Sequence, residues 1–369
     1  MMRALKHRPD KLLLFLVISL VSIGLFVLAS ASLVKSQTTF QESYYYLQHQ
    51  FIFGTLIGAL FFYLGFKIKY VFWRKIVIVL FLISLGLLCL LFLPQFGVKL
   101  GGARRWINIG GQVFQPSEFI KITFIMYIAA WLSSRSKDIN SISKTVIPFI
   151  TLNGALGVLF LLQPDMGSLL IIYVCSGLLF ALSGLNFKII AVLLIIGVIL
   201  GLFLVILSPY RLPRLLSFLE PNSDPLGSSY QLRQALIGLG SGGVFGRGYG
   251  QSIQKTGYLP ESIGDSIFVI LVEELGIIGG GALVIIFLTI ALKGFKIAKR
   301  APDQFSRLLA VGITLLIVCQ ALINIMAISG LIPLTGLTLP LVSYGSSSYI
   351  ATLFGLGVLM NISTYTQKT

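Results

Sequence analysis

Several ionisable side chains lie inside or beside long apolar stretches of the sequence, where a charge is costly. Glu118 and Lys121 are three residues apart, Asp265 comes directly before an apolar stretch, and Glu273 and Glu274 lie within that stretch. A charged side chain at the centre of a bilayer costs about 2.5–3.5 kcal/mol on insertion scales. Such residues commonly bind an ionic ligand, carry protons or pair with one another. They are therefore the first candidates for chemistry.

Each of these residues also has a purely structural interpretation. Glu118 and Lys121 would share one helix face, where they can form an ion pair that holds helices together. Asp265 can cap the helix that comes after it, and Glu273 and Glu274 can make a buried polar contact. Asp165, a further acid that follows Pro164, can also cap a helix. Taken together, the acids and bases favour a site for an amphiphilic or ionic ligand in one half of a membrane protein.

Arginines in two loops are further candidates, because they can contact an anionic group. Arg104 and Arg105 are adjacent, and a solvated surface pair is the alternative interpretation. Arg233 and Arg247 lie in the long segment 209–265. Long loops rich in proline and glycine at a membrane surface usually carry function.

Transmembrane helices must position these residues. Hydrophobic residues make up 56% of the 369 positions and charged residues only 11%, whereas soluble domains carry about 25% charged residues. A helix needs roughly 20 apolar residues to cross the hydrocarbon core. We therefore predict an all-α integral membrane protein with about ten transmembrane helices in a single domain, residues 1–369. The predicted spans are 12–33, 49–66, 76–94, 116–133, 146–163, 167–184, 188–208, 266–292, 307–328 and 339–360.

The loops between these spans set the predicted orientation. Lysine and arginine gather in alternate connections, whereas most acids, prolines and glycines fall in the others. By the positive-inside rule, both termini are cytoplasmic and 209–265 is a large extracytoplasmic loop between the seventh and eighth helices. The first span ends in Ala29-Ser30-Ala31, which imitates a signal-peptide cleavage site. Its apolar stretch is longer than a signal peptide requires, so we expect an uncleaved helix.

Several other functions are disfavoured. The net charge of +16 is explained by the basic loops, and no basic face with interleaved aromatic residues indicates nucleic-acid binding. The stretch 238–243 matches GxGxxG, but no strand precedes it. Two histidines and three scattered cysteines form no metal motif. The short cytoplasmic connections leave no room for a nucleotide-binding domain, so we expect neither a nucleotide nor an organic cofactor. A carboxylate-bound divalent cation is compatible with the sequence.

A series of short motifs runs through most of the chain. They are Gly102-Ala103-Arg104-Arg105-Trp106-Ile107, Gln115-Pro116-Ser117-Glu118 with Lys121, Gln163-Pro164-Asp165-Met166-Gly167, Tyr230-Gln231, Gln234-Ala235, Gly240-Ser241-Gly242-Gly243 with Phe245-Gly246, Tyr258-Leu259-Pro260-Glu261, Asp265, Glu273-Glu274-Leu275-Gly276, and Leu339-Pro340-Leu341-Val342-Ser343-Tyr344-Gly345. Together these motifs resemble the SEDS family, the polytopic membrane proteins of bacterial shape, elongation, division and sporulation.

The resemblance implies a peptidoglycan glycosyltransferase that polymerises lipid II, an undecaprenyl-pyrophosphate-linked disaccharide-pentapeptide. Asp265 matches the family's essential aspartate and would be the general base for inverting transfer, or would hold a magnesium or manganese ion. The substrate-binding candidates for pyrophosphate and sugar are Arg104, Arg105, Glu118, Lys121, Arg233, Arg247, Ser343 and Ser346. Asp165, Glu273 and Glu274 are expected to line a polar cavity.

The resemblance also implies a cellular setting. Gln254-Lys255 and Thr335-Gly336-Leu337-Thr338 are similar to the division members of the family, with the elongation members as the alternative. The expected location is the bacterial cytoplasmic membrane, with the active site facing outward. The expected partners are a class B penicillin-binding protein transpeptidase and regulators of the divisome. A lipid II flippase and a recruiting scaffold are the competing functions.

Two positions depart from the family pattern. Ile263-Gly264 stands where the family usually has His-Thr before the aspartate. Gly345-Ser346 stands where a Gly-Gly pair is usual. The first departure raises the question of how Asp265 is oriented.

Overall fold

The protein was examined in a computed structural model, which describes residues 7–366 except 101–102, 207–211, 221–223, 225–226 and 228. Three features of the sequence analysis lie outside the described residues. They are the last two residues of the predicted span 188–208, the first glycine of the Gly102 motif, and the beginning of the 209–265 loop at Pro209.

Each of the ten predicted spans overlaps a helical segment. Two of these segments begin before their main helix. The short helix α3 (Tyr45–His49) and a π-helical stretch (Gln50–Leu56) lead directly into α4, and a second π-helical stretch (Ile142–Val146) leads into α7. The long helices are α1 (Lys11–Ala31), α4 (Ile57–Lys67), α5 (Tyr70–Leu90), α6 (Pro116–Ser134), α7 (Ile147–Leu162), α8 (Met166–Leu182), α9 (Phe187–Ile206), α12 (Ile267–Lys299), α13 (Gln304–Ile328) and α14 (Ser346–Ser363).

Length and apolarity identify most of these helices as membrane spans. Within the described residues, seven helical segments are long and apolar enough to cross a bilayer, and α8 and α9 contain shorter apolar stretches. The prediction of a helical membrane protein is therefore confirmed: seven of the ten segments meet these criteria, and α8 and α9 are apolar but shorter. The remaining one, α6, carries the buried Glu118 and Lys121.

The structure differs from the prediction in two places. The last helix begins at Ser346 rather than near residue 339, because Leu341 (φ 60°) and Gly345 (φ 156°) interrupt the helical backbone. The predicted loop at 95–115 forms a three-stranded antiparallel sheet in the order β1 (Gly97–Leu100), β2 (Ala103–Ile109), β3 (Gln112–Phe114). Gly110 and Gly111, both with positive φ, make the turn between β2 and β3, a conformation that favours glycine.

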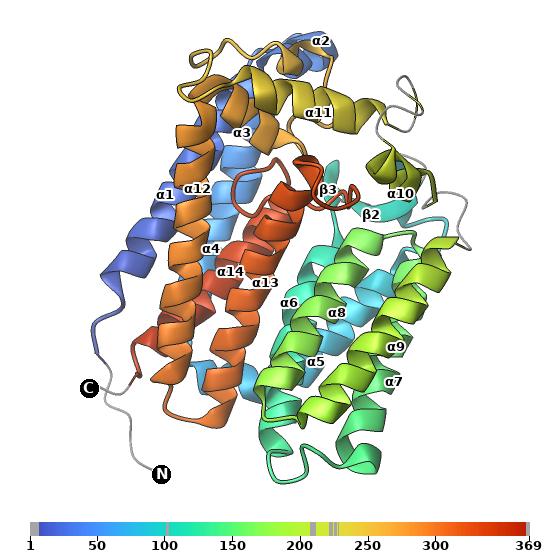
Figure 1. The fold of residues 1–369 in the computed structure, drawn as a ribbon. Coiled ribbons are helices and arrows are strands. Elements are labelled where there is room, and N and C mark those ends of the chain that lie inside the picture. Colours follow the sequence, from blue (N-terminus) through green and yellow to red (C-terminus); the bar gives the residue numbers. More distant parts are fainter. Residues whose placement is uncertain are drawn as a thin grey trace.

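The helices form a bundle whose centre is α13, which packs against α6, α8, α12 and α14. Figure 1 shows α1, α4, α12, α13 and α14 on one side of the bundle and α5 to α9 on the other. The central helices α13 and α14 are largely enclosed by protein, whereas α5 and α12 expose most of their apolar surface. Exposed apolar side chains at membrane depth face lipid.

Loop elements cover one end of the bundle. Figure 1 shows α2 (Leu33–Phe40), α10 (Leu212–Leu219), α11 (Tyr230–Ser241) and the small sheet at this end. The two ends of the described chain meet at the other end, where the backbone nitrogen of His7 donates to the carbonyl oxygen of Thr364 across 2.7 Å. Both ends of the described chain therefore lie at the end of the bundle opposite the long loop.

The helix α12 bends where the glycine motifs meet it. Gly276 has φ 70° and ψ −173° inside the helix. A β-carbon on Gly276 would overlap the carbonyl oxygen of Val244, and one on Gly246 would overlap that of Glu274. The Gly-rich stretch therefore packs backbone to backbone against the bend, which only glycine allows.

Candidate active site

The carboxylate of Asp265 lies between the covering loop and the helix bundle. Nε2 of Gln231, on α11, lies 3.3 Å from Oδ1 of Asp265 and 3.1 Å from Oγ of Ser266. Oγ of Ser266 donates to the same Oδ1 across 3.2 Å. Ser266 rather than Asp265 is the N-cap of α12. The aspartate side chain is therefore not used as a helix cap.

Two polar side chains, Asn324 and Ser343, hold the backbone around Asp265. Nδ2 of Asn324, on α13, donates to the carbonyl oxygens of Asp265 and Leu337 across 2.8 Å and 2.6 Å. Oγ of Ser343 donates to the carbonyl oxygen of Gly264 across 2.7 Å. The aspartate is therefore fixed in place from both the central helix and the 331–345 loop.

The electrostatic surroundings keep the carboxyl group weakly acidic. Burial, and after it the charge of nearby Glu261, raise the pKa of Asp265 to about 6. The hydrogen bonds from Ser266 and Gln231 and the charge of Arg214 act in the opposite direction. A carboxyl with a pKa near neutral accepts protons better than an ordinary aspartate and is still largely ionised at pH 7.

Gly336 leaves space beside the carboxylate. It has φ 70°, and a β-carbon there would lie 3.9 Å from both Oδ2 of Asp265 and Nη1 of Arg214. Nη1 of Arg214, on α10, also donates to the carbonyl oxygen of Leu334 across 3.2 Å. The carboxylate of Asp265 and the guanidinium group of Arg214 therefore both lie beside Gly336.

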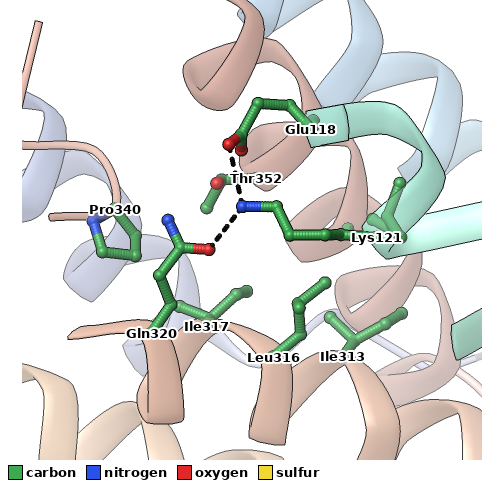
Figure 2. Close-up of a pocket in the computed structure, with 11 residues that line it drawn as sticks. Glu118, Lys121, Ile313, Leu316, Ile317, Gln320, Pro340 and Thr352 are labelled. Atoms are coloured by element: carbon green, nitrogen blue, oxygen red, sulfur yellow. Dashed lines mark hydrogen bonds and ion pairs between the residues drawn. The ribbon is translucent and has the colours of Figure 1, made fainter. Parts of the chain in front are cut away.

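Glu118 and Lys121 form a buried ion pair in the bundle. Nζ of Lys121 lies 2.8 Å from Oε1 of Glu118 and donates to Oε1 of Gln320 across 2.9 Å. Figure 2 shows these three side chains converging, with Pro340 and Thr352 beside them. They line a cavity of about 20 Å³, which is room for a water molecule and too small for a sugar.

Hydrogen bonds connect this ion pair to the surroundings of Asp265. Nε2 of Gln320 donates to the carbonyl oxygen of Thr338 across 3.0 Å, and Oγ1 of Thr338 lies 3.2 Å from Oγ of Ser348. Asn324, which holds the backbone of Asp265, is one helical turn beyond Gln320 on the same face of α13. The polar face of α13 thus runs from the ion pair to the aspartate.

Glu274 belongs to a second buried cluster, away from that face. Nζ of Lys255 lies 2.9 Å from Oε1 of Glu274 and donates to Oγ of Ser30 across 2.7 Å and to the carbonyl oxygen of Gly250 across 2.8 Å. Oγ of Ser30 in turn donates to Oε1 of Glu274 across 2.6 Å. The cluster ties the 242–256 segment to α1 and α12.

Glu273 anchors the same segment through backbone groups. Its carboxylate accepts from the backbone nitrogens of Ile253 and Gln254 across 3.1 Å and 3.2 Å. Nη1 of Arg247 lies 3.4 Å from Oε1 of Glu273. The sequence analysis placed Glu273 and Glu274 among the cavity residues and Arg247 among the substrate-binding candidates. In the structure these three residues hold the 242–256 segment against α12 and do not lie beside Asp265.

The remaining candidates are dispersed. Arg105 donates to the carbonyl oxygens of Gln163 and Pro164, and Arg104 is exposed on β2. Asp165 caps α8 by accepting from the backbone nitrogen of Ser168 across 3.3 Å, which matches its structural interpretation.

Three side-chain oxygens near these candidates lack a partner. Within the described residues, Oδ2 of Asp165, Oγ1 of Thr335 and Oγ of Ser346 are buried without a hydrogen bond. Buried polar atoms without a hydrogen bond are costly, and they are natural contact points for a polar ligand.

Arg233, another of the predicted substrate-binding residues, is half-buried on α11.

Four residues around the two sites were not among the predicted site residues. Gln231 lay in a quoted motif, but Arg214, Gln320 and Asn324 did not. Asn324 and Gln320 are polar residues four apart inside an apolar stretch, a signal of the same kind as Glu118 and Lys121. Arg214 follows a proline in the long loop and has no local signal.

The fold and the buried polar groups define a polytopic membrane protein with an acidic site at one end of its helix bundle. A family model described as cell cycle protein, covering FtsW, RodA and SpoVE, matches residues 10–368. The chain is 39% identical over 364 residues to stage V sporulation protein E of Bacillus subtilis, covering 98% of this chain and 99% of that protein. It is 37% identical over 356 residues to "Probable peptidoglycan glycosyltransferase FtsW" of Trichlorobacter lovleyi, covering 96% and 93%.

Solved structures agree with these relatives. A chain from a structure described as "Structural coordination of polymerization and crosslinking by a peptidoglycan synthase complex" matches with a TM-score of 0.78 and 27% identity, over 96% of this chain and 97% of that chain. The rod shape determining protein RodA of Thermus thermophilus matches with a TM-score of 0.69 and 27% identity, over 98% of both chains. This chain belongs to the FtsW, RodA and SpoVE family, as its motifs indicated, and is a multi-pass membrane protein.

Proposed function

We propose that this chain is a peptidoglycan glycosyltransferase that polymerises lipid II into glycan strands. The observation that carries the proposal is the carboxylate of Asp265, partly exposed at the covered end of the bundle and held by Gln231 and Ser266. The relatives named as peptidoglycan glycosyltransferases over nearly the whole chain support the same activity.

The proposed reaction is a single displacement. The 4-hydroxyl of the acceptor GlcNAc attacks the anomeric carbon of the donor sugar, and the bond to the pyrophosphate breaks with its electron pair leaving on the phosphate oxygen. Asp265 accepts the hydroxyl proton as the new bond forms. Attack opposite the leaving group converts an α-linked donor into a β-linked glycan. The pyrophosphate leaves as an anion, so no second carboxyl is needed as an acid, unlike in glycosidases.

Cations must stabilise the departing pyrophosphate. Arg214 is positioned for this role, because it borders Gly336 together with Asp265. Arg104, exposed on β2, and Arg233, half-buried on α11, remain candidates for binding the phosphates before or after transfer. Lys121 and Arg247 pair with the buried carboxylates of Glu118 and Glu273, and Arg105 donates to loop carbonyl oxygens, so we assign these three to holding the fold.

A divalent cation at Asp265 is a further part of the proposal. Within the described residues no three histidine, cysteine or carboxylate side chains form a cluster. Magnesium suits such a site because it keeps several waters and binds through one or two carboxylates and substrate phosphates. Asp265 would hold the ion as the alternative to its role as general base, and the ion would neutralise charge on the leaving group. Chelation should then abolish polymerisation, and magnesium or manganese should restore it.

The relatives support two candidate cellular roles. We propose action in septal wall synthesis, since several relatives of 34–37% identity are named FtsW. The 39% identity to a stage V sporulation protein over 99% of its length supports spore-wall synthesis as the second candidate. Complementation of division-defective and sporulation-defective strains separates these two roles.

We propose that the site faces outward, that both termini are cytoplasmic, and that the chain works with a class B penicillin-binding protein and divisome regulators. The solved neighbour described as a synthase complex that coordinates polymerization and crosslinking supports a transpeptidase partner. The basic residues at the end opposite α11 support the orientation.

The activity is tested with purified protein and labelled lipid II. Polymerisation in detergent, alone and with the cognate transpeptidase, should produce glycan strands. The same protein in vesicles is assayed for lipid II scrambling. Strands without scrambling support the polymerase. Scrambling without strands contradicts it and favours a flippase.

A further inference from the structure

A second cavity lies at the end of the bundle opposite Asp265. Its volume is about 180 Å³, far more than a single water requires. Three parts of the chain form it: the segment before α1, the last two turns of α12 and the end of α14. The lining residues are Arg8, Asp10, Lys293, Lys296, Ile297, Arg300, Ser363 and Thr366.

The lining is strongly basic. It contains four cationic side chains and one carboxylate. Oδ2 of Asp10 pairs with Nζ of Lys293 across 3.2 Å. No acid among the described residues forms an ion pair with Arg8, Lys296 or Arg300. The cavity therefore holds three cations without a protein counter-ion, an arrangement that favours an anion.

The walls of the cavity are fixed by the fold. The backbone nitrogen of Asp10 donates to Oγ of Ser363 across 3.3 Å, and that of His7 donates to the carbonyl oxygen of Thr364. The start of α1 is therefore attached to the end of α14. The helices α1 and α12 also pack against each other. The concavity is part of the bundle and not a chance grouping of surface side chains.

The surface next to the cavity is apolar. Phe15 on α1 is 64% exposed and Leu292 on α12 is 72% exposed. Both lie within about two helical turns of lining residues on their own helices. A ligand that filled the cavity with an anionic group could therefore lay hydrocarbon along α1 and α12.

We propose that this cavity binds the phosphate group of an anionic membrane phospholipid, with its acyl chains along α1 and α12. Basic pockets between transmembrane helices on the cytoplasmic side are typical sites for anionic lipid head groups. The cavity and Asp265 lie at opposite ends of α12, on the order of 40 Å apart. The lipid site is therefore separate from the proposed catalytic site and does not depend on it.

Native mass spectrometry of the purified full chain tests the proposal. The protein is titrated with phosphatidylglycerol or phosphatidylcholine of the same acyl chains. Wild type should retain phosphatidylglycerol preferentially, and excess inorganic phosphate should not displace it. Lys296→Gln with Arg300→Gln should weaken retention about 30-fold, since each basic residue near an anionic surface contributes roughly a factor of five.

A matched control uses two exposed lysines of the same expected membrane face that do not line the cavity. Lys137→Gln with Lys188→Gln removes the same charge and should leave retention unchanged. Arg8→Gln, in the exposed segment before α1, should weaken retention about fivefold even if the double variant folds poorly.

Three results would overturn the lipid site. Equal retention by wild type and the Lys296/Arg300 variant, or equal retention of both lipids, would show that the cavity does not select an anionic head group. Displacement of phosphatidylglycerol by inorganic phosphate would show a site for a free anion instead.

Discussion

Nε2 of Gln231 lies 3.3 Å from Oδ1 of Asp265, so the helix α11 of the covering loop meets the beginning of α12 at the carboxylate. This hydrogen bond favours the ionised form, while the charge of Glu261 disfavours it. Burial raises the pKa of Asp265 most, and these two neighbours then shift it in opposite directions.

The pH dependence of polymerisation should report this balance. The pKa of Asp265 is raised to about 6, and only the carboxylate can accept a proton, so kcat/KM should fall as the pH drops through about 6. Gln231→Leu removes a hydrogen bond to the carboxylate and should move this limb to higher pH. Glu261→Gln removes a negative charge and should move it to lower pH. Identical limbs in all three proteins would contradict the assignment.

Asn324 should act as a positioning residue. Asn324→Asp removes the amide that donates to the carbonyl oxygens of Asp265 and Leu337. An unpaired buried carbonyl costs about 1–3 kcal/mol, so we expect a lower melting temperature and a lower kcat with KM little changed. Asn140→Asp is the control, because its side-chain oxygen accepts from Asn186 at an exposed site and an aspartate still can. A wild-type kcat in the Asn324 variant would contradict this role.

The buried ion pair should matter for stability. Lys121→Met leaves Glu118 buried without its cation, which costs about 3–5 kcal/mol, so the melting temperature in detergent should fall sharply. Adding Glu118→Gln should recover part of the loss. Lys144→Met breaks the exposed pair with Asp138 and should change stability by only about 0–1 kcal/mol. Equal effects of the two lysine substitutions would show that burial is not decisive.

The bend in α12 should tolerate only glycine. Gly276→Ala places a β-carbon against the carbonyl oxygen of Val244 at φ 70°, so the 242–256 segment must shift and the protein should lose stability. Gly281, on the same helix, has no neighbour that a β-carbon would meet. Gly281→Ala should be neutral or stabilise by up to about 1 kcal/mol. Limited proteolysis of the covering loop and thermal melting distinguish the two variants.

The sequence was sufficient for the helices, because lipid requires long apolar segments and each one is visible locally. Asp265 was also visible locally, as an acid at the beginning of such a segment. Its partners were not, since Gln231 is 34 residues away and Asn324 59 residues away. Only the packing of α11 and α13 brings Gln231 to the carboxylate and Asn324 to the backbone of Asp265.

The role of Glu273 and Glu274 could not be predicted from the sequence. Buried acids at a membrane edge suggested a ligand site, yet the structure surrounds them with backbone nitrogens of the 252–254 segment and with Lys255. The free-energy cost of burying a carboxylate can be offset by protein groups as well as by a ligand, and the sequence does not distinguish these two cases.

The small sheet was missed because its strands are short, although Gly110-Gly111 between β2 and β3 is a hairpin signal.

The most direct test of the central claim is the rate of lipid II polymerisation by Asp265→Asn, compared with wild type and with Asp138→Asn. Asp138 is a surface acid paired with Lys144, so its substitution controls for loss of one carboxylate. We predict that Asp265→Asn folds and melts like wild type but polymerises about 10²–10⁴-fold more slowly, the range for loss of a general base, while Asp138→Asn retains full activity. Glycan strands from Asp265→Asn at the wild-type rate would contradict the account.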